Sequence, residues 1–482
     1  MDQTIIIAEL ALYLLAMLLI GLYFSRKKLT QAEYHLGGKK IKGWALALSE
    51  RATGESAWLI LGLTGAAYAT GLAELWVVFG CVGGVIVSWL FLARRFRAEA
   101  ERYHALTYVD YFAFKYKHRA GLIRWFASVV IIFFYTLYVY AQFEGGGKVL
   151  NQTFGIDPVW GITISAVVTI LYSMSGGFPA IVWTDVVQAV LMILTFIVTP
   201  VVAVVVLVNG DISLVATPSS AGSWGSMMGG KEGWGAFLLA LAGFSWFFGY
   251  LGGQPQLSTR WMAMRNDQDV RRGTTIAIAW TLVAYAGAIL IGLSAHALYG
   301  AGAVEDPEKI LPFMLHQLLP AWLVGLLLVG AIAAMMSTAS SQLLLVTSSA
   351  AEDIVHKGLK KDYDDKKLVL ISRVTLLVVG AAALALALGL GKPIFSVVSW
   401  AWAGIGCSFS PAILLAFYWR RFSSAGVVVS LVSGFAMTVI WMSSGLYLKL
   451  SVMAVSFATS LVCAIVASLL APDPQEDASA AV

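Results

Sequence analysis

Charged side chains are scarce in this chain. Only 12% of its 482 residues are Asp, Glu, Lys or Arg, and 59% are hydrophobic, whereas soluble proteins carry about 25% charged residues. This shortage excludes a soluble globular protein and indicates a polytopic membrane protein. The net charge of +5 does not indicate nucleic-acid binding, because the basic residues are concentrated in alternate loops.

Cysteine and histidine are also rare. The three cysteines, Cys81, Cys407 and Cys463, each lie in an apolar run and form no CxxC pair, which excludes a disulfide framework. The six histidines show no spacing typical of metal ligands. The sequence also has no nucleophile–base set, no HExxH motif and no phosphate-binding loop. It therefore predicts a protein that is not an enzyme and uses no organic cofactor.

Long hydrophobic runs dominate the chain instead. A membrane helix needs about 20 apolar residues, and thirteen such segments predict an all-α polytopic membrane protein. Residues 5–24 form a full span with no small-residue cleavage site after it, so we do not expect a cleavable signal. The predicted spans are 5–24, 43–71, 75–94, 121–146, 157–177, 180–208, 234–256, 273–299, 319–350, 368–388, 393–418, 424–444 and 449–470.

Basic residues divide the loops between these spans into two classes. Loops with several Lys or Arg alternate with loops that hold single lysines. By the positive-inside rule, this alternation predicts a plasma (inner) membrane protein with its N-terminus outside and its C-terminus in the cytoplasm. The expected partners are the lipid bilayer and a small-molecule substrate, with no nucleic acid and no obligatory protein partner. The loops rich in basic residues are 26–42, 94–119, 260–272, 357–367 and 420–421.

Two predicted spans contain helix-breaking sequences. "LSERATGES" (48–56) interrupts the second span, and "FSWFFGYLGGQPQ" (244–256), with three glycines and a proline, interrupts the seventh. Five-helix units of inverted topology, each beginning with a discontinuous helix, describe the LeuT-like transporter architecture. We therefore expect a 5+5 inverted repeat of spans 2–6 and 7–11. The expected divisions are a first helix and cytoplasmic loop (1–42), two repeats (43–209 and 210–423), peripheral helices (424–470) and a disordered cytoplasmic tail (471–482).

Several motifs carry a resemblance to a known family. The chain resembles the sodium/solute symporter family and, within it, the sodium/proline symporter branch. This resemblance implies a sodium-coupled secondary active symporter that imports a small amino acid, proline in the first instance, by alternating access. The matching segments are "SAWLILGLTGAAYATG" (56–71), "ILYSMSGGFPAIVWTDVVQAVLMI" (170–193), "GYLGGQPQLSTRWMA" (249–263), "AAMMSTASSQLLLVTSSAAEDI" (333–354) and "WAWAGIGCSFSPAILLAFYWRR" (400–421).

The resemblance also implies where sodium binds. Na⁺ prefers oxygen ligands, and an interrupted helix offers free carbonyl groups beside Ser and Thr hydroxyls. Some family members hold a second sodium ion, although packing of small residues between helices equally explains the hydroxyl cluster here. Sodium is the only metal that we expect. The implied ligands are the carbonyls of Ala52, Glu55 and Ala334 and the hydroxyls of Ser337 and Thr338, and those of the possible second ion are Asp185, Ser340 and Ser341.

A substrate site is implied beside the same breaks. Ser56 and its neighbouring amides are expected to contact a substrate carboxylate, since half-helix N-termini favour negative charge. Tyr138, Trp246 and Tyr250 are expected to surround the apolar part of the substrate, where aromatic faces also attract an ammonium group. Gln254 continues the second break. Ordinary core packing remains an alternative for Tyr138.

Four charged residues depart from the family pattern. Arg51 and Glu55 are four residues apart and are expected to pair, while Glu50, Arg51 and Glu144 are expected to act in gating or coupling. The proline branch has an aspartate where this chain has Gly54. The extra charges leave other functions open. The chain could carry a substrate with a second positive or acidic group, use a proton-linked step, couple sodium or protons to another carboxylate or amine, or act as a transporter-like membrane sensor.

Overall fold

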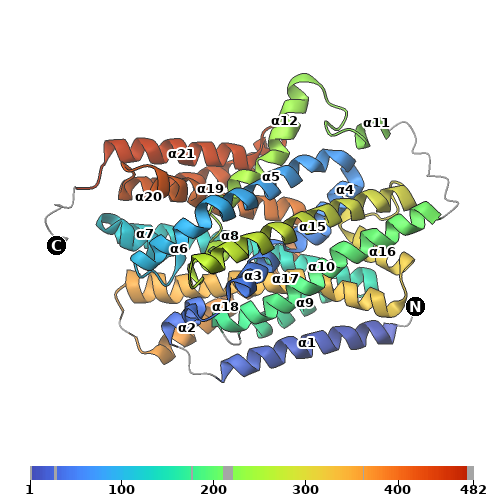
Figure 1. The fold of residues 1–482 in the computed structure, drawn as a ribbon, viewed down its shortest axis with the longest axis horizontal. Helices are drawn as coiled ribbons and strands as arrows, with labels where there is room; N and C mark the ends of the chain where they lie inside the picture. Colours follow the sequence, from blue (N-terminus) through green and yellow to red (C-terminus); the bar gives the residue numbers. More distant parts are fainter. Residues whose placement is uncertain (1–2, 27–29, 175–176, 210–220, 362, 475–482) are drawn as a thin grey trace.

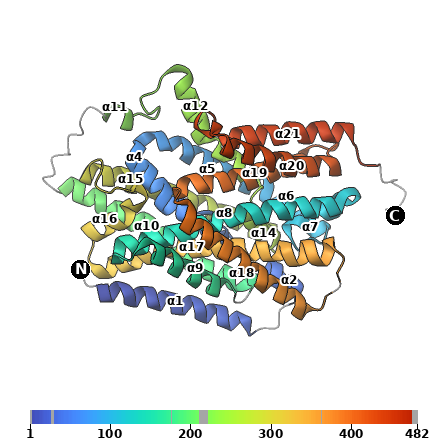
Figure 2. The same cartoon turned by 180° about the vertical axis from the view of Figure 1, so that it is seen from behind.

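The helices of this protein lie side by side along one common direction (Figure 1). The computed structural model describes residues 3–26, 30–174, 177–209, 221–361 and 363–474, and all regular structure within them is helical. The start of α1 and the end of α21 lie at opposite ends of the molecule (Figures 1 and 2). Residues 475–482 of the predicted disordered tail lie outside the described residues.

The first part of the chain, up to residue 209, forms ten α-helices and five short 3-10 or π-helical segments. They are α1 (Gln3–Ser25), α2 (Gln31–Leu36), η1 (Gly37–Lys39), α3 (Gly43–Gly54), η2 (Trp58–Leu63), α4 (Thr64–Thr70), η3 (Gly71–Glu74), α5 (Leu75–Val87), η4 (Ser88–Leu92), α6 (Ala93–Arg102), α7 (Tyr108–Lys115), η5 (Lys117–Arg119), α8 (Ala120–Phe154), α9 (Pro158–Ser173) and α10 (Gly177–Asn209).

The second part of the chain continues the same pattern of long helices with short connecting segments. They are α11 (Ala221–Trp224), α12 (Gly233–Phe244), α13 (Trp246–Tyr250), α14 (Pro255–Met262), α15 (Asp267–Tyr299), η6 (Pro307–Lys309), α16 (Ile310–Leu318), α17 (Ala321–Ser348), η7 (Ser349–Gly358), α18 (Asp365–Leu390), α19 (Ile394–Tyr418), α20 (Ser424–Ser443), η8 (Leu446–Leu448) and α21 (Val452–Leu470).

Within the described residues, eleven helical segments are long and apolar enough to cross a membrane. The predicted spans 43–71 and 75–94 share one of these segments, Trp58–Arg102. The predicted span 157–177 corresponds to α9, which has 16 residues. The prediction of an all-α polytopic membrane protein is confirmed, and the number of thirteen spans stays a prediction.

Helices α17 and α19 are the most deeply buried long helices, whereas α1 and α18 expose most of their surface. The N-terminal half of the broken second span, α3, packs against α10, α15 and α17. Helices α20 and α21 pack against each other and against α19, along one edge of the molecule (Figure 1). The two breaks therefore lie inside a shell of continuous helices.

Both predicted breaks are present in the structure. Helix α3 ends at Gly54, Glu55 leaves the helical conformation with φ −107° and ψ 77°, and η2 begins at Trp58 as a π-helix. In the seventh span α13 ends at Tyr250 and α14 begins at Pro255. Gly252 between them has φ +77°, a conformation that side chains other than glycine rarely adopt.

One sequence prediction about the basic loops is wrong. Arg260 was placed in the loop 260–272, but it lies in α14 and its side chain is only 1% exposed. Helix α14 continues the broken span, so the chain is still inside the protein at this position. The buried guanidinium is stable there because it forms an ion pair with the buried carboxylate of Asp185.

Candidate functional site

The end of α3 meets the middle of α17 at the centre of the molecule. The Ser337 hydroxyl donates to the carbonyl of Ala52 at 2.9 Å and to the carbonyl of Ala334 at 3.0 Å. The next residue, Thr338, donates its hydroxyl to the carbonyl of Thr53 at 3.0 Å. All five residues are fully buried. Carbonyl and hydroxyl oxygens from two helices therefore converge on one place, which is the chemistry that a small hard cation requires.

Glu55 lies at the break itself, and each of its two carboxylate oxygens has a hydrogen-bond donor. Its Oε1 atom accepts from Arg51 Nη1 at 3.0 Å, so the predicted Arg51–Glu55 pair is present. Its Oε2 atom accepts from the Tyr285 hydroxyl at 2.9 Å. Arg51 also donates through Nε and Nη2 to both carboxylate oxygens of Glu50, which in addition accepts from Trp89 Nε1 at 3.2 Å. The three charged side chains carry a net charge of −1 and are almost completely buried.

Arg260 and Asp185 form a second buried charge pair, close to the end of α3. Arg260 Nη2 lies 3.1 Å from Asp185 Oδ2 and 2.6 Å from the hydroxyl of Ser341. Ser49 donates to the same carboxylate oxygen at 2.6 Å, and Thr53 does so at 3.2 Å. Two of the three residues expected at a second sodium site thus contact a guanidinium.

The third of those residues, Ser340, is directed elsewhere. Its hydroxyl donates to the carbonyl of Ser337 at 3.1 Å, within its own helix. The Oδ1 atom of Asp185 is buried and has no hydrogen-bond partner among the described residues.

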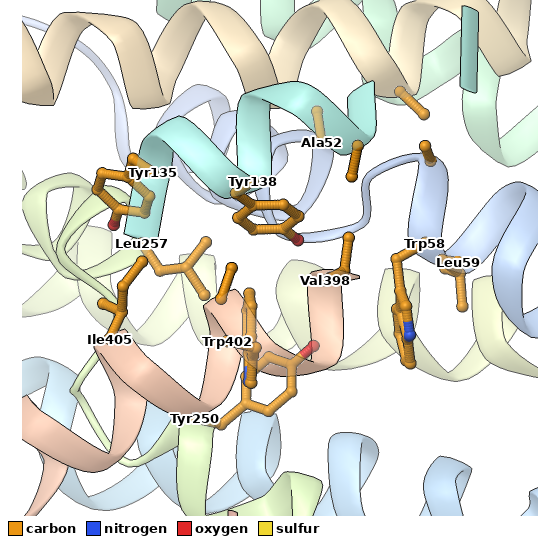
Figure 3. Close-up of a cluster of buried hydrophobic side chains, with 14 of the residues drawn as sticks. Ala52, Trp58, Leu59, Tyr135, Tyr138, Tyr250, Leu257, Val398, Trp402 and Ile405 are labelled. Atoms are coloured by element: carbon orange, nitrogen blue, oxygen red, sulfur yellow. The ribbon is translucent and has the colours of Figure 1, made fainter. Parts of the chain in front are cut away.

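Five aromatic side chains from four segments gather beside the two breaks, and four of them, Trp58, Tyr138, Tyr250 and Trp402, are labelled in Figure 3. The ring centroids of Trp58 and Trp246 are 4.3 Å apart, and those of Tyr250 and Trp402 are 4.7 Å apart. Trp402 also lies edge-on to Tyr138, at 6.2 Å. In Figure 3 the hydroxyl ends of Tyr138 and Tyr250 both point to the side on which Trp58 lies. Such a cluster offers flat apolar faces that can also attract a cation.

Ser56 connects the first break to this cluster. Its hydroxyl lies 3.1 Å from the Tyr138 hydroxyl and accepts from the Trp58 amide at 3.1 Å. The Ala57 amide donates to Gln142 Oε1 at 3.0 Å. The side chains of Ser56 and Gln142 therefore accept from the amides at the start of η2. A ligand carboxylate can take their place as the acceptor.

Gln254 joins the second break to α19. Its Nε2 atom donates to the carbonyls of Gly249 and Trp402, each at 3.2 Å. A Cβ atom added to Gly249 would lie 2.4 Å from the Trp402 indole. The broken segment and α19 thus pack in direct backbone contact, and Gln254 fixes their relative position.

A vestibule of 370 Å³ leads toward the aromatic cluster from one end of the molecule. Trp246 and Phe395 line its inner part, and Glu74, Lys231 and Lys449 also line it. This is the end that carries the loops with single lysines. The end of α21 and the helices α2, α6 and α7 lie at the opposite end (Figure 1).

Glu144 belongs to a different cluster from Glu50 and Arg51. It lies in α8 near Lys148 and Glu308. Lys148 pairs with Asp306 at 2.7 Å and with Glu308 at 2.5 Å. Both Glu308 oxygens also accept from the first amides of α19, those of Ile394 and Phe395, at 3.0 and 2.9 Å. The residues expected to act in gating are therefore divided between two places.

Comparison with known proteins establishes the family. The family model described as "Sodium:solute symporter family" matches residues 34–434. The chain belongs to this family. The resemblance that the motifs indicated is confirmed, and the protein is a membrane transporter rather than an enzyme.

Curated relatives of this symporter cover almost its whole length. The osmoregulated proline transporter OpuE of Bacillus subtilis (strain 168) is 33% identical over 475 residues, which are 97% of this chain and 95% of that protein. The sodium/proline symporter of Escherichia coli (strain K12) is 32% identical over 450 residues, which are 92% of this chain and 89% of that protein.

Solved structures identify the fold. A Na⁺-coupled sialic acid symporter in a substrate-bound outward-open state has a TM-score of 0.78 with this symporter, at 20% identity, over 98% of this chain and 99% of that chain. The LeuT-like fold class predicted from the two broken spans is confirmed.

Sequence reasoning missed several residues of the site. Tyr285 and Trp402 gave no signal, because single aromatic residues in membrane helices are common. Thr53 and Gln142 act through contacts with distant segments. Arg260 could have been found, since it follows the second break by a few residues and a buried Asp185 needs a positive partner.

Proposed function

We propose that the protein is a sodium-coupled symporter that imports proline by alternating access. The observation that carries this proposal is the junction of α3 and α17, where Ser337 and Ala52 bring hydroxyl and carbonyl oxygens together beside the aromatic cluster. Glu55, a proposed sodium ligand, and Ser56, a proposed substrate contact, are adjacent in the sequence, so the sodium site and the substrate site are neighbours. The names of the curated relatives, which are proline transporters and sodium/proline symporters, support the choice of ion and substrate.

The proposed sodium ligands come from both helices of this junction. They are the carbonyls of Ala52, Glu55 and Ala334 and the hydroxyls of Ser337 and Thr338. We assign a single sodium ion to the transport cycle, because the Arg260 guanidinium already supplies a positive charge to Asp185 and Ser341. A second cation there would face like-charge repulsion at close range.

The charge balance of the site supports a simple zwitterion as substrate. Four N–H groups of Arg51 are bonded to Glu50, Glu55 and Thr281, so this arginine is not available to a second acidic group of a substrate. Both oxygens of Glu50 and of Glu55 also have donors. Substrates with an additional charged group would find no free partner among these residues.

Ser56 and the amides after it are the proposed contacts of the substrate carboxylate. Tyr138, Trp246 and Tyr250 surround the pyrrolidine ring, and Gln254 holds the second break in position. Glu50 and Arg51 maintain the charge balance behind the site. Glu144 belongs to the network of Lys148 and Glu308, which ties α8 to α19 when the vestibule end is closed.

We assign the vestibule end and the N-terminus to the outside of the plasma (inner) membrane, and the C-terminus to the cytoplasm. The loops rich in basic residues then face the cytoplasm, as the positive-inside rule requires. The divisions 43–209 and 210–423 are the proposed repeats, which rock against each other around the central site. Residues 424–470 are peripheral to this motion.

Uptake into vesicles that contain only the purified protein tests this function. An inward sodium gradient should drive accumulation of labelled proline, and an equal potassium gradient should not. The ratio of sodium to proline flux should be close to one. Accumulation driven by a proton gradient without sodium would contradict the proposed coupling ion, and a flux ratio near two would contradict the single sodium site. Absence of any flux together with proline binding would favour a sensor.

A further inference from the structure

Three side chains, one from the break after α3 and two from the helices α13 and α15, form one hydrogen-bonded chain beside the aromatic cluster. The Tyr285 hydroxyl of α15 donates to Glu55 Oε2 at 2.9 Å. The Tyr250 hydroxyl of α13 lies 2.9 Å from the Tyr285 hydroxyl. Glu55 and Tyr285 are fully buried, and Tyr250 is nearly so.

The direction of these hydrogen bonds follows from the number of protons available. A tyrosine hydroxyl has one proton to donate and can also accept. The Glu55 carboxylate is paired with Arg51 and accepts at both oxygens. Tyr285 therefore gives its proton to Glu55, and Tyr250 must give its own proton to Tyr285. The Tyr250 oxygen is left with lone pairs only.

We propose that the relay Glu55–Tyr285–Tyr250 makes the Tyr250 oxygen the acceptor for an N–H group of the substrate ammonium. Glu55 and Tyr285 are then positioning residues that restrict transport to zwitterions with at least one ammonium N–H. This inference rests on the proposed function, in which Tyr250 borders the substrate. The thiol of Cys81 also lies beside the two hydroxyls, but a thiol is a weak donor and leaves this acceptor open to an ammonium group.

Recognition through the aromatic faces alone would have a different result. Cation–π attraction requires a positive charge but no N–H group. Proline carries two N–H bonds on its ring nitrogen and N,N-dimethylproline carries none, although both are zwitterions with the same ring. A ratio of their affinities therefore separates acceptance by Tyr250 from attraction by the aromatic cluster.

The experiment measures binding of proline and of N,N-dimethylproline to the purified full chain at saturating sodium, by calorimetry. The wild type should bind proline at least about tenfold more tightly. Tyr285→Phe and Tyr250→Phe should each reduce that ratio by about tenfold, mainly by weakening proline binding. Tyr140→Phe is the matched control, because Tyr140 is equally buried and its hydroxyl bonds only to the backbone of Lys392. It should leave the ratio unchanged.

Equal wild-type affinity for the two ligands would overturn the inference without any variant, so the test does not depend on the stability of a substituted protein. An unchanged ratio in Tyr285→Phe, with sodium-dependent proline binding retained, would also overturn it while leaving the proposed function intact. Absence of any sodium-dependent proline binding to the wild type would overturn the proposed function, and this inference with it.

Discussion

The Arg260 guanidinium and the Asp185 carboxylate are 3.1 Å apart in a part of the protein that is closed to solvent. This pair joins α14, the half-helix after the second break, to α10. Ser49 and Thr53 of α3 contact the same carboxylate oxygen. One ion pair thereby holds three helices around the ends of both broken spans.

Removal of either partner should be far more harmful than removal of both charges. Asp185→Asn and Arg260→Gln are each expected to lower the free energy of unfolding by about 3–5 kcal/mol, because each leaves a buried charge without its partner. The double variant should lose clearly less than the sum of the two. A double-mutant cycle on the purified protein, unfolded by denaturant, measures this coupling. Strictly additive losses would contradict a direct interaction.

Ser337→Ala should weaken sodium binding. The substitution removes one oxygen from the junction of α17 with Ala52, and we expect the sodium concentration for half-maximal binding to rise about tenfold, or about 1.4 kcal/mol. Ser456→Ala is a matched control, since Ser456 is also fully buried and its hydroxyl accepts from Thr438 at 2.9 Å, away from both breaks. The rise in melting temperature with increasing sodium concentration measures sodium binding in both variants. An unchanged sodium requirement in Ser337→Ala would remove this hydroxyl from the ligand set.

Glu308→Gln should loosen the closure at the vestibule end. The side-chain amide keeps one acceptor oxygen for the first amides of α19, so one of the two bonds is lost together with the charge that pairs with Lys148. We expect a loss of about 2 kcal/mol in the free energy of unfolding. Glu305→Gln, in the same loop but exposed, should have almost no effect. Equal stability of the two variants would show that the Lys148 pair is not holding this end together.

The stability of the protein should fall as the pH falls below neutrality, in part because of His35. Burial lowers the pKa of His35 from 6.5 to about 4, with Glu352 opposing the shift and Lys357 adding to it. The unfolded chain therefore binds a proton between pH 6.5 and 4 that the folded protein does not bind, so stability is complete above pH 6.5 and is lost as the pH falls through this window. Below this pH window, the loss in the free energy of unfolding that is due to His35 amounts to about 3 kcal/mol.

His35→Gln should remove this part of the pH dependence. The difference in melting temperature between pH 7 and pH 5 should become smaller than in the wild type. His104→Gln is the control, because His104 is exposed and should leave the wild-type difference unchanged. A His35→Gln variant with the full wild-type difference would assign the acid sensitivity to other groups.

The sequence was sufficient to predict the class of fold, because hydrophobic length and helix-breaking residues are local properties. The clusters of Gly and Pro at 249–255 and of Gly and charged residues at 50–55 mark the breaks directly. The ligands on α17 came from the resemblance to a family, and the structure brings them to the end of α3. Their roles stay predictions until sodium binding is measured.

Other parts of the site depend on contacts that no local pattern reveals. Arg260 reaches across from α14 to Asp185, 75 residues away in sequence, and its burial contradicts the general rule that arginine in a membrane protein marks a loop. Tyr285 lies in the middle of an ordinary hydrophobic span, and the packing of α15 against α3 brings its hydroxyl to Glu55. Glu144 shows the opposite case, since its unusual charge lies near Lys148 and Glu308 rather than at the central site.

The close contact between Gly249 and Trp402 also constrains how this family of sequences can diverge. A single methyl group at position 249 would lie 2.4 Å from the indole ring, so Gly249 cannot be enlarged while Trp402 keeps its position. The two positions are expected to vary together among relatives, with glycine at 249 wherever 402 is tryptophan and a larger residue only where 402 is smaller. Mutational paths to a new substrate that enlarge Gly249 must therefore first reduce Trp402.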